Sequence, residues 1–216
     1  MARYTQAVCR LCRREAQKLY LKGSRCYGPK CAFEKRQTPP GAGSGGTQGG
    51  KKGRQIKPSD YALQLRAKQK CRRIYGVLET QFRRYVREAQ RERGVTGEAL
   101  LQHLERRLDN VVYRAGLAPS RSAARQAVRH RHVAVNGGVV DIPSYSVREG
   151  DVVEVRERSR PKRPFAQAKE AGGGARVPQW LDVDWSQFRV AVKAVPTREQ
   201  IDSEVNEALI VEYYAR

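Results

Sequence analysis

Four of the five cysteines lie within the first 31 residues, at a spacing that suits one tetrahedral metal ion. Cys9 and Cys12 are separated by two residues, Cys26 and Cys31 by four, and thirteen residues lie between the two pairs. Four thiolates held together repel one another unless a divalent cation compensates their charge, and the cation then supplies folding energy to a segment with few apolar residues. The spacing predicts one structural zinc ion bound by all four cysteines, with no open coordination position for catalysis.

An iron–sulfur cluster is the main alternative to zinc, because four cysteines also suit that cofactor. Free thiols are a simpler alternative, and disulfides are disfavoured in a reducing cytosol. Cys71 stands alone on an expected helix, and we interpret it as a small packing residue.

Guanidinium groups gather on two expected helices near the middle of the chain. An apolar stripe within 104–114 leaves the polar residues of that helix on its more exposed faces, and three arginines of the next helix recur every four residues. The residues concerned are Arg106, Arg107, Asn110, Arg114, Arg121, Arg125 and Arg129. Arginine makes bidentate contacts with phosphates and stacks on bases, so the two helices together predict a nucleic-acid-binding surface, although a single exposed arginine is usually only solvated.

The overall charge points to the same class of partner. A net charge of +21 favours a polyanion, and RNA, DNA and an anionic membrane are the candidates. Residues 1–97 contain 24 Lys and Arg against 6 Asp and Glu, so this half is expected to supply most of the attraction. The sequence has neither a run of about 18 apolar residues nor an apolar signal segment, which disfavours a membrane partner and predicts a cytoplasmic protein.

Helices and a short sheet are expected to position these residues. Ser59 and Asp60 suit the start of a basic amphipathic helix, Thr96 is expected to cap another that Gly116 ends, and Ser120 opens a further one. The expected helices span 60–75, 79–93, 96–115 and 120–130, and the expected strands span 133–135, 139–140, 152–155, 188–192 and 209–214.

Three stretches of the chain resemble the small RNA-binding module that takes its name from the fourth protein of the small ribosomal subunit. They are LERRLDNVVYR at 104–114, SRSAARQ at 120–126 and VNG at 135–137. The cysteine segment, the blocks 59–61, 64–66, 68–70 and 75–84, and the closing residues 205–207 and 210–214 resemble the ribosomal protein itself. Nearly the whole chain is therefore similar to the bacterial family of that protein, in its zinc-binding cysteine variant. The departure is Gly41 to Lys52, a glycine-rich run where relatives carry a shorter, more basic segment.

The resemblance implies a non-enzymatic structural constituent of the small ribosomal subunit. Such a protein is a primary binder of small-subunit ribosomal RNA, nucleates assembly of the subunit body and, with the neighbouring fifth small-subunit protein, influences translational accuracy. A contact with messenger RNA near the point where it enters the subunit is also implied, and some family members repress their own messenger RNA. The residues predicted to contact RNA are Arg66, Lys68, Lys70, Arg72, Arg73, Arg83, Arg84, Arg106, Arg107, Asn110, Tyr113, Arg114, Ser120, Arg121, Arg125, Gln126, Arg129, His130, His132 and Asn136.

Two other functions fit the sequence less well. An RNA-modifying or aminoacylating enzyme would need a catalytic domain, and the rest of the chain shows no phosphate-binding loop and no recognisable nucleophile and base. A zinc-dependent DNA-binding regulator would need helices that read a major groove, yet Asn and Gln are sparse on the basic helices.

The sequence as a whole predicts an α+β fold with a metal-binding knuckle, a basic helical domain, a module of two helices and a β-hairpin that binds RNA, and a C-terminal tail that packs back. The expected parts are the cysteine-rich segment 1–40, a glycine-rich linker 41–57, the basic helical domain 58–97 with residues 179–216 packed on it, the RNA-binding module 98–160 and a Pro/Gly-rich connector 161–178.

Overall fold

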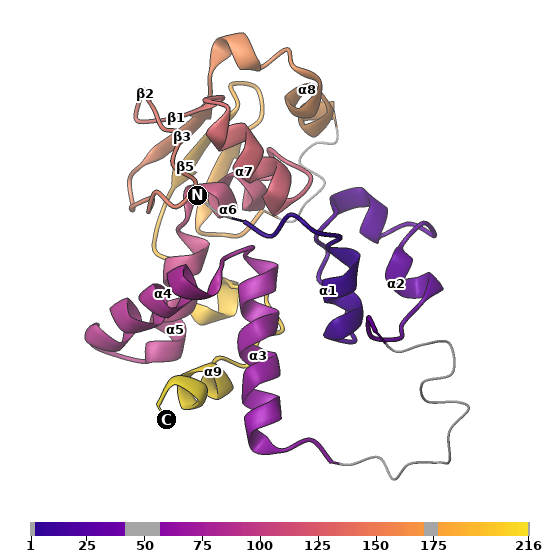
Figure 1. Cartoon of the computed structure of the whole chain (residues 1–216). Helices are drawn as coiled ribbons and strands as arrows, with labels where there is room; N and C mark the ends of the chain where they lie inside the picture. The colour runs from indigo at the N-terminus through magenta and orange to yellow at the C-terminus, as the bar shows by residue number, and fades with distance from the viewer. Residues whose placement is uncertain (1–2, 42–56, 171–176, 216) are drawn as a thin grey trace. The chain divides into compact units, whose positions relative to one another are not determined.

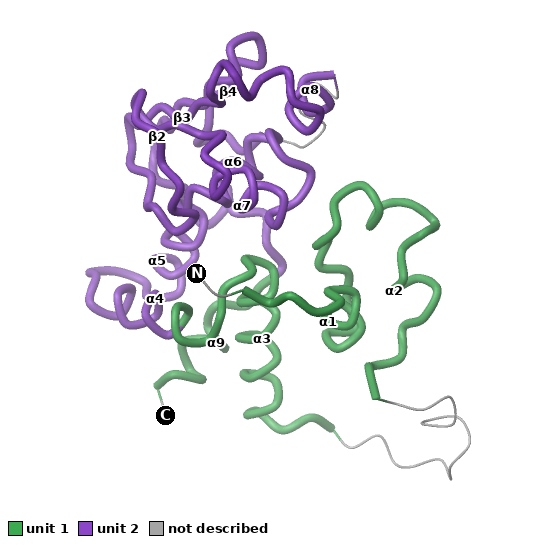
Figure 2. The backbone as a smooth tube through the Cα atoms, turned by 45° about the horizontal axis from the view of Figure 1, so that its top comes forward, with its two compact units in different colours: residues 1–82, 205–216 green, residues 83–204 purple. Residues whose placement is uncertain are grey.

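The computed structural model describes residues 3–41, 57–170 and 177–215, which fall into two compact units (Figure 2). Unit 1 comprises residues 1–82 and 205–216, and unit 2 comprises residues 83–204. The expected linker 41–57 lies almost entirely outside the described residues, as do residues 171–176 of the expected connector.

Unit 1 is helical in the part that the structure describes (Figure 1). Its elements are α1 (Cys9–Arg14), η1 (Gly23–Cys26), α2 (Ala32–Lys35), α3 (Asp60–Ile74), the start of α4 (Glu79–Arg91) and α9 (Glu207–Tyr214). Ser59 begins α3 as predicted, because its Oγ accepts a hydrogen bond from the backbone N–H of Ala62 at 3.3 Å. Helix α9 packs along α3, and the rings of Tyr61 and Tyr213 lie 5.8 Å apart between them.

The predicted strand over 209–214 is wrong, because these residues form α9. The side chain of Asn206 accepts hydrogen bonds from the backbone N–H groups of Ala208 and Leu209 and so caps a helix. Ile210 is fully buried. A short apolar run suits either a helix or a strand, and here the cap and the packing against α3 decide for the helix.

Unit 2 combines helices with a sheet that, among the described residues, has five strands, all antiparallel. The strands run in the order β2-β1-β3-β5-β4. The strands are β1 (Val133–Val135), β2 (Gly138–Val139), β3 (Val152–Val155), β4 (Leu181–Asp184) and β5 (Arg189–Val192). The helices are the rest of α4, α5 (Thr96–Glu105), α6 (Leu108–Arg114), α7 (Arg121–Arg129), η2 (Glu157–Ser159), α8 (Arg163–Glu170) and η3 (Arg198–Gln200). The mixture of helices with an antiparallel sheet agrees with the predicted fold class.

Strands β4 and β5 change the expected role of the C-terminal tail. Strand β5 pairs with β3, so residues 181–192 complete the sheet of unit 2 instead of packing on residues 58–97. Only the segment from residue 205 onward belongs to unit 1. The expected connector 161–178 also contains α8, whose Phe165 is buried in the core of unit 2. Short apolar strands far apart in sequence give no local signal of which partner they will find.

The expected helix 96–115 is interrupted after Glu105. Arg107 has an extended backbone, and the backbone N–H of Leu108 donates to the carbonyl of Tyr145 at 2.9 Å. The N–H of Val147 in turn donates to the carbonyl of Arg106 at 2.9 Å. An isolated β-bridge between Arg107 and Ser146 thus separates α5 from α6, while the apolar residues on both sides of the break stay buried. Thr96 is the first helical residue rather than a cap, whereas Ser120 caps α7 through the N–H of Ala123 as predicted.

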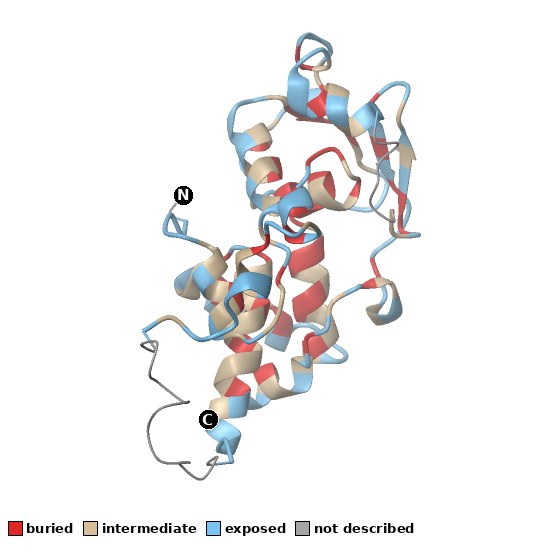
Figure 3. Ribbon diagram, turned by 90° about the vertical axis from the view of Figure 1, so that its right-hand side faces the viewer, coloured by how far each residue is buried: buried red, intermediate tan, exposed pale blue. Residues whose placement is uncertain are grey.

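The core of unit 2 lies between the sheet and helices α6 and α7. Val111, Val128, Val133 and Val190 are each 0% exposed, and Trp180 is 2% exposed. The helices contain both buried and exposed residues (Figure 3), and the buried ones recur every three or four positions, as amphipathic helices require. None of the helices in the described ranges is both long and apolar enough to cross a membrane.

Candidate nucleic-acid interface

The residues predicted to contact RNA differ widely in exposure. The exposed ones are Arg83, Arg84, Gln126, Arg129, His130 and Asn136. The partly buried ones are Arg66, Lys70, Arg72, Arg73, Arg106, Tyr113, Arg114, Arg121, Arg125 and His132. The buried ones are Lys68, Arg107, Asn110 and Ser120. The expectation that Arg107 and Asn110 lie on exposed faces is wrong, because the break after α5 turns both side chains into the unit.

Arg107 belongs to a buried ion cluster at the start of α6. Its guanidinium makes two hydrogen bonds to the Asp109 carboxylate, at 3.1 and 2.9 Å, and a third to the Tyr85 hydroxyl at 2.6 Å. Arg125 of α7 donates to the same carboxylate at 3.2 Å. Burial lowers the pKa of Arg107, but the Asp109 carboxylate outweighs it, so that the pKa is raised overall. The Asp109 carboxylate therefore joins α6 to α7 through Arg125, and Arg107 joins the start of α6 to Tyr85 of α4.

A second buried cluster surrounds Glu105 at the end of α5. Its carboxylate accepts hydrogen bonds from Arg114 at 2.7 and 3.0 Å and from the Asn110 amide at 2.7 Å. The oxygen of the Asn110 amide accepts from Arg121 at 2.8 Å, and the Arg121 guanidinium lies 4.5 Å from the ring of Tyr113. These contacts fix the angle between α5, α6 and α7. Much of the motif at 104–114 therefore organises the module internally.

The basic residues of α3 also have internal partners. Lys68 donates to Glu79 at 2.9 Å, and the hydroxyl of Tyr214 on α9 donates to the same carboxylate at 2.9 Å. Burial would raise the pKa of Glu79, but the hydrogen bonds from Lys68 and Tyr214 lower it overall. On the other side of α3, Arg66 and Arg73 both bind the carboxylate of Glu15, whose pKa is raised because burial outweighs the two arginines. The carboxylates thus hold α1 and α9 to a cationic helix.

A group of cations remains at the surface of unit 2, and we call it the basic patch. It consists of the exposed residues Arg129, His130, Arg131, Arg158, Lys162 and Arg163, together with the half-buried Arg156. The segment 156–163 joins the end of α7 because the N–H of Arg156 donates to the carbonyl of His132 at 3.0 Å, and the His132 ring contacts the Ser159 hydroxyl and Phe165. The residues predicted from the sequence do not include this segment, although its density of arginine and lysine is a visible signal.

The positive charges of the basic patch act on the pKa of the neighbouring His132 imidazole. Burial lowers the pKa of this imidazole, and the positive charges of Lys162, His130, Arg158 and Arg156 lower it further. Within the described ranges, the one ion pair of the patch is that of Arg131 with Asp141, at 3.1 Å and open to solvent. A surface with this excess of positive charge attracts the phosphate groups of a nucleic acid.

Asn136 is exposed, but its side chain holds the sheet. Its amide oxygen accepts from the N–H of Val152, and its amide nitrogen donates to Asp151, both at 2.8 Å. The residue has a φ of 49°, in the left-handed region that Asn tolerates better than most residues. Asn136 thus fixes the turn after β1 against β3.

The four cysteines of the predicted metal site all lie in unit 1. Cys9 and Cys12 are on α1, Cys26 ends η1 and Cys31 precedes α2, and none of them forms a disulfide. Burial raises the pKa of Cys12, and the other three cysteines add to the rise, so each of these three lies within electrostatic range of Cys12. Among the described residues, no three His, Cys, Asp or Glu side chains have a geometry that would hold a metal ion. The zinc ion therefore stays a prediction.

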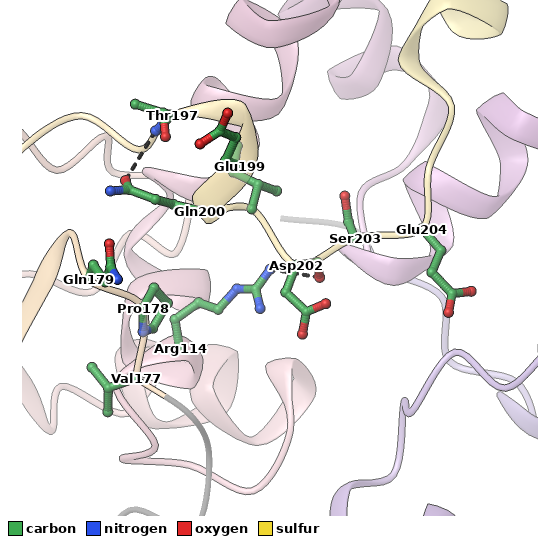
Figure 4. Close-up of a pocket in the computed structure, with 11 residues that line it drawn as sticks. Arg114, Val177, Pro178, Gln179, Thr197, Glu199, Gln200, Asp202, Ser203 and Glu204 are labelled. Carbon is green, nitrogen blue, oxygen red and sulfur yellow. Dashed lines mark hydrogen bonds between the residues drawn. The ribbon is translucent and has the colours of Figure 1, made fainter.

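A cavity of about 670 Å³ in unit 2 has the opposite character to the basic patch. Carboxylates of Glu199, Asp202 and Glu204 line it, and all three residues are exposed. Arg114 reaches towards this wall and donates to the carbonyl of Asp202 at 3.4 Å (Figure 4). Carboxylates repel phosphates, so this cavity does not suit RNA and instead suits a cationic group.

Two family models match the chain. One, described as the ribosomal protein S4/S9 N-terminal domain, matches residues 3–105, and the other, described as the S4 domain, matches residues 106–153. The boundary between the two matches coincides with the break between α5 and α6.

Curated relatives match over the full length of both chains. A small ribosomal subunit protein uS4A of Symbiobacterium thermophilum is 58% identical over 216 residues. The uS4 proteins of Acidothermus cellulolyticus and Pelotomaculum thermopropionicum are 56% and 54% identical, also over 216 residues. In each case the alignment covers 100% of this chain and 100% of the relative. The chain therefore belongs to the uS4 family of small ribosomal subunit proteins, a family of ribosomal structural proteins and not of enzymes.

Proposed function

We propose that the chain binds small-subunit ribosomal RNA directly, as a primary binder that nucleates assembly of the subunit body, and that the basic patch is its main contact on unit 2. Membership of the uS4 family makes the chain an RNA-binding component of the small subunit, located in the cytoplasm as part of the ribosome. The observation that supports the assignment of the patch is its concentration of exposed cations, of which only Arg131 has an ion pair among the described residues.

Salt dependence of RNA binding tests the basic patch. Replacement of Arg129, Arg158 and Lys162 by Ala should lower the slope of log affinity against log salt concentration by about 0.7 to 0.9 for each phosphate that is no longer bound. Lys193→Ala is the matched control, because this exposed lysine lies in the same unit and pairs with Asp182 at 3.3 Å. If the triple variant and the control gave equal slopes, the patch would not be the site of RNA binding.

The role of primary binder is tested with protein-free RNA. The purified chain should bind folded small-subunit ribosomal RNA without any other ribosomal protein, and this RNA should outcompete duplex DNA of equal length at matched salt. Equal affinity for the two nucleic acids would contradict the proposal. We also propose a contact with messenger RNA near the point where it enters the subunit. Crosslinking the protein in cells and sequencing the attached RNA would test this contact and any binding to the protein's own messenger RNA.

We also propose one structural zinc ion bound by Cys9, Cys12, Cys26 and Cys31. The support is the chemistry of the set: four thiols brought into electrostatic range, with three of them buried and an N–H of Lys22 donating to Cys26 Sγ at 3.3 Å. Elemental analysis of the purified protein should find about one zinc per chain, and Cys26→Ser should reduce that content. Bound iron with visible absorption would favour the iron–sulfur cluster instead. If the protein contained neither zinc nor iron, the four cysteines would be free thiols.

The acidic cavity supports a contact with a neighbouring protein, which we propose to be the fifth small-subunit protein. The carboxylates of Glu199 and Glu204, which line the cavity, would attract a basic segment of the fifth protein. A Glu199→Lys, Glu204→Lys variant should bind the purified fifth protein more weakly and ribosomal RNA no more weakly than wild type. Unchanged affinity for the fifth protein would place this contact elsewhere and remove the support for a shared effect on translational accuracy.

A further inference from the structure

Two tyrosines of the cysteine-rich segment stack on each other at the surface of unit 1. The ring centroids of Tyr20 and Tyr27 lie 4.9 Å apart with an angle of 25° between the ring planes. Tyr20 is 41% exposed and Tyr27 is 71% exposed, the largest exposure among the exposed large hydrophobic residues of the described chain. The contact between the rings buries part of each, but most of the Tyr27 side chain faces solvent.

The backbone at Tyr20 is held in an unfavourable conformation. Its φ is 50°, in the left-handed region that residues with a side chain rarely adopt. Such conformations cost free energy and tend to persist where a binding site needs them. Here the strained backbone is that of Tyr20, whose ring is one of the two that stack.

The segment that carries the two rings is strongly cationic. Residues 3–41 contain ten Lys and Arg and only two acidic residues, Glu15 and Glu34. Both acids are already engaged, Glu15 with Arg66 and Arg73 and Glu34 with Lys18. Lys22, Arg25 and Lys30, which neighbour the tyrosines in sequence, are exposed. The two rings therefore belong to a segment whose positive charge far exceeds that of its own acids.

We infer that the Tyr20–Tyr27 pair is a stacking platform for an unpaired base of RNA. An aromatic ring with a solvent-facing side in a cationic segment suits a nucleotide, because the base stacks on the ring and the cations bind its phosphate. RNA has a phosphate at every nucleotide, whereas a protein partner would need a cluster of carboxylates to meet the same cations. This inference rests on the proposed function, and it identifies single-stranded nucleotides, not duplex, as what the cysteine-rich segment binds.

Affinity of the full-length chain for folded small-subunit ribosomal RNA tests the platform. Tyr27→Leu should weaken binding by about 5- to 150-fold, the decrease expected for one stacked base, whereas Tyr27→Phe should stay within about twofold of wild type because it keeps the ring. The salt slope of Tyr27→Leu should equal that of wild type, since stacking releases no counterions. Lys30→Gln is the electrostatic control and should lower the slope by about 0.7 to 0.9.

Ultraviolet crosslinking of the unaltered protein to the same RNA gives an independent measurement. Mass spectrometry should find a nucleotide attached to Tyr27 or Tyr20. The inference is overturned if Tyr27→Leu binds as tightly as wild type, if Tyr27→Phe loses as much affinity as Tyr27→Leu, or if crosslinks form elsewhere but at neither tyrosine. These failures differ from failure of the proposed function, in which the wild-type chain itself would show no preference for ribosomal RNA over duplex DNA.

Discussion

Asp109→Asn is the sharpest test of the claim that the arginines at 107 and 125 organise unit 2. Asn has the shape of Asp but no charge, so the substitution leaves the Arg107 guanidinium in place, 3% exposed, without the carboxylate that compensates it. Arg125 loses the same partner. The perturbation therefore changes the electrostatics of the cluster and hardly its packing.

The expected cost follows from burial. Removing one partner of a buried ion pair destabilises a protein by about 3 to 5 kcal/mol, whereas an exposed pair contributes about 0 to 1 kcal/mol. Asp141→Asn is the matched control, because Asp141 pairs with Arg131, whose side chain is 69% exposed. The free energy of unfolding falls by about 2 kcal/mol for each molar increase in urea. Asp109→Asn should therefore lower the urea midpoint for unfolding of unit 2 by about 1.5 to 2.5 M, and the control should lower it by less than about 0.5 M.

Tryptophan fluorescence is a suitable assay, because both tryptophans of the chain, Trp180 and Trp185, lie in unit 2. The signal therefore follows the unfolding of the unit that contains the cluster. If the two variants shifted the midpoint equally, Asp109 would not be acting as a buried counter-charge, and the arginines around it would be available for phosphate.

Three further predictions concern residues whose partners are internal. Ser120→Ala should destabilise unit 2 by about 1 kcal/mol in the same fluorescence assay, because α7 loses its cap, and it should leave the salt slope of RNA binding unchanged. Asn136→Ala should cost about 1 to 3 kcal/mol, since it removes two hydrogen bonds and leaves Ala at positive φ; a cost below about 0.5 kcal/mol would contradict its role in the turn. The pKa of Glu79 is lowered on folding, so its stabilising contribution is fully present above its ordinary pKa of 4.5 and is lost as the pH falls through the folded value. Glu79→Gln should therefore destabilise unit 1 at pH 7, measured by circular dichroism in urea, and the difference from wild type should shrink below pH 4.5.

Local patterns in the sequence are enough to predict most elements. Apolar spacing and caps locate α3, α4 and α7, and the turn at 136–138 predicts the β1–β2 hairpin. These features depend on residues within a few positions of one another, where helix and turn preferences act directly.

Contacts between distant residues account for what the sequence does not reveal. The interruption after α5 depends on backbone hydrogen bonds to residues 145–147, and the helical state of 207–214 depends on packing against α3. The same holds for the candidate site: charge density predicts cationic surfaces, but only the fold shows that Glu105 and Asp109 occupy several of the arginines. The amino-acid composition does not distinguish a guanidinium bound to a buried carboxylate from one open to solvent.

The discontinuity of unit 1 has a consequence for the order of events during synthesis. Helix α3 and its partner α9 are separated by the whole of unit 2, so the ribosome releases residues 60–74 long before residues 207–214. Until then the hydrogen bond from Tyr214 to Glu79 cannot form, and the side of α3 that α9 covers stays open. Unit 2 is contiguous and can fold as soon as residue 204 has emerged, so the packing of α9 on α3 is the last step of folding during synthesis.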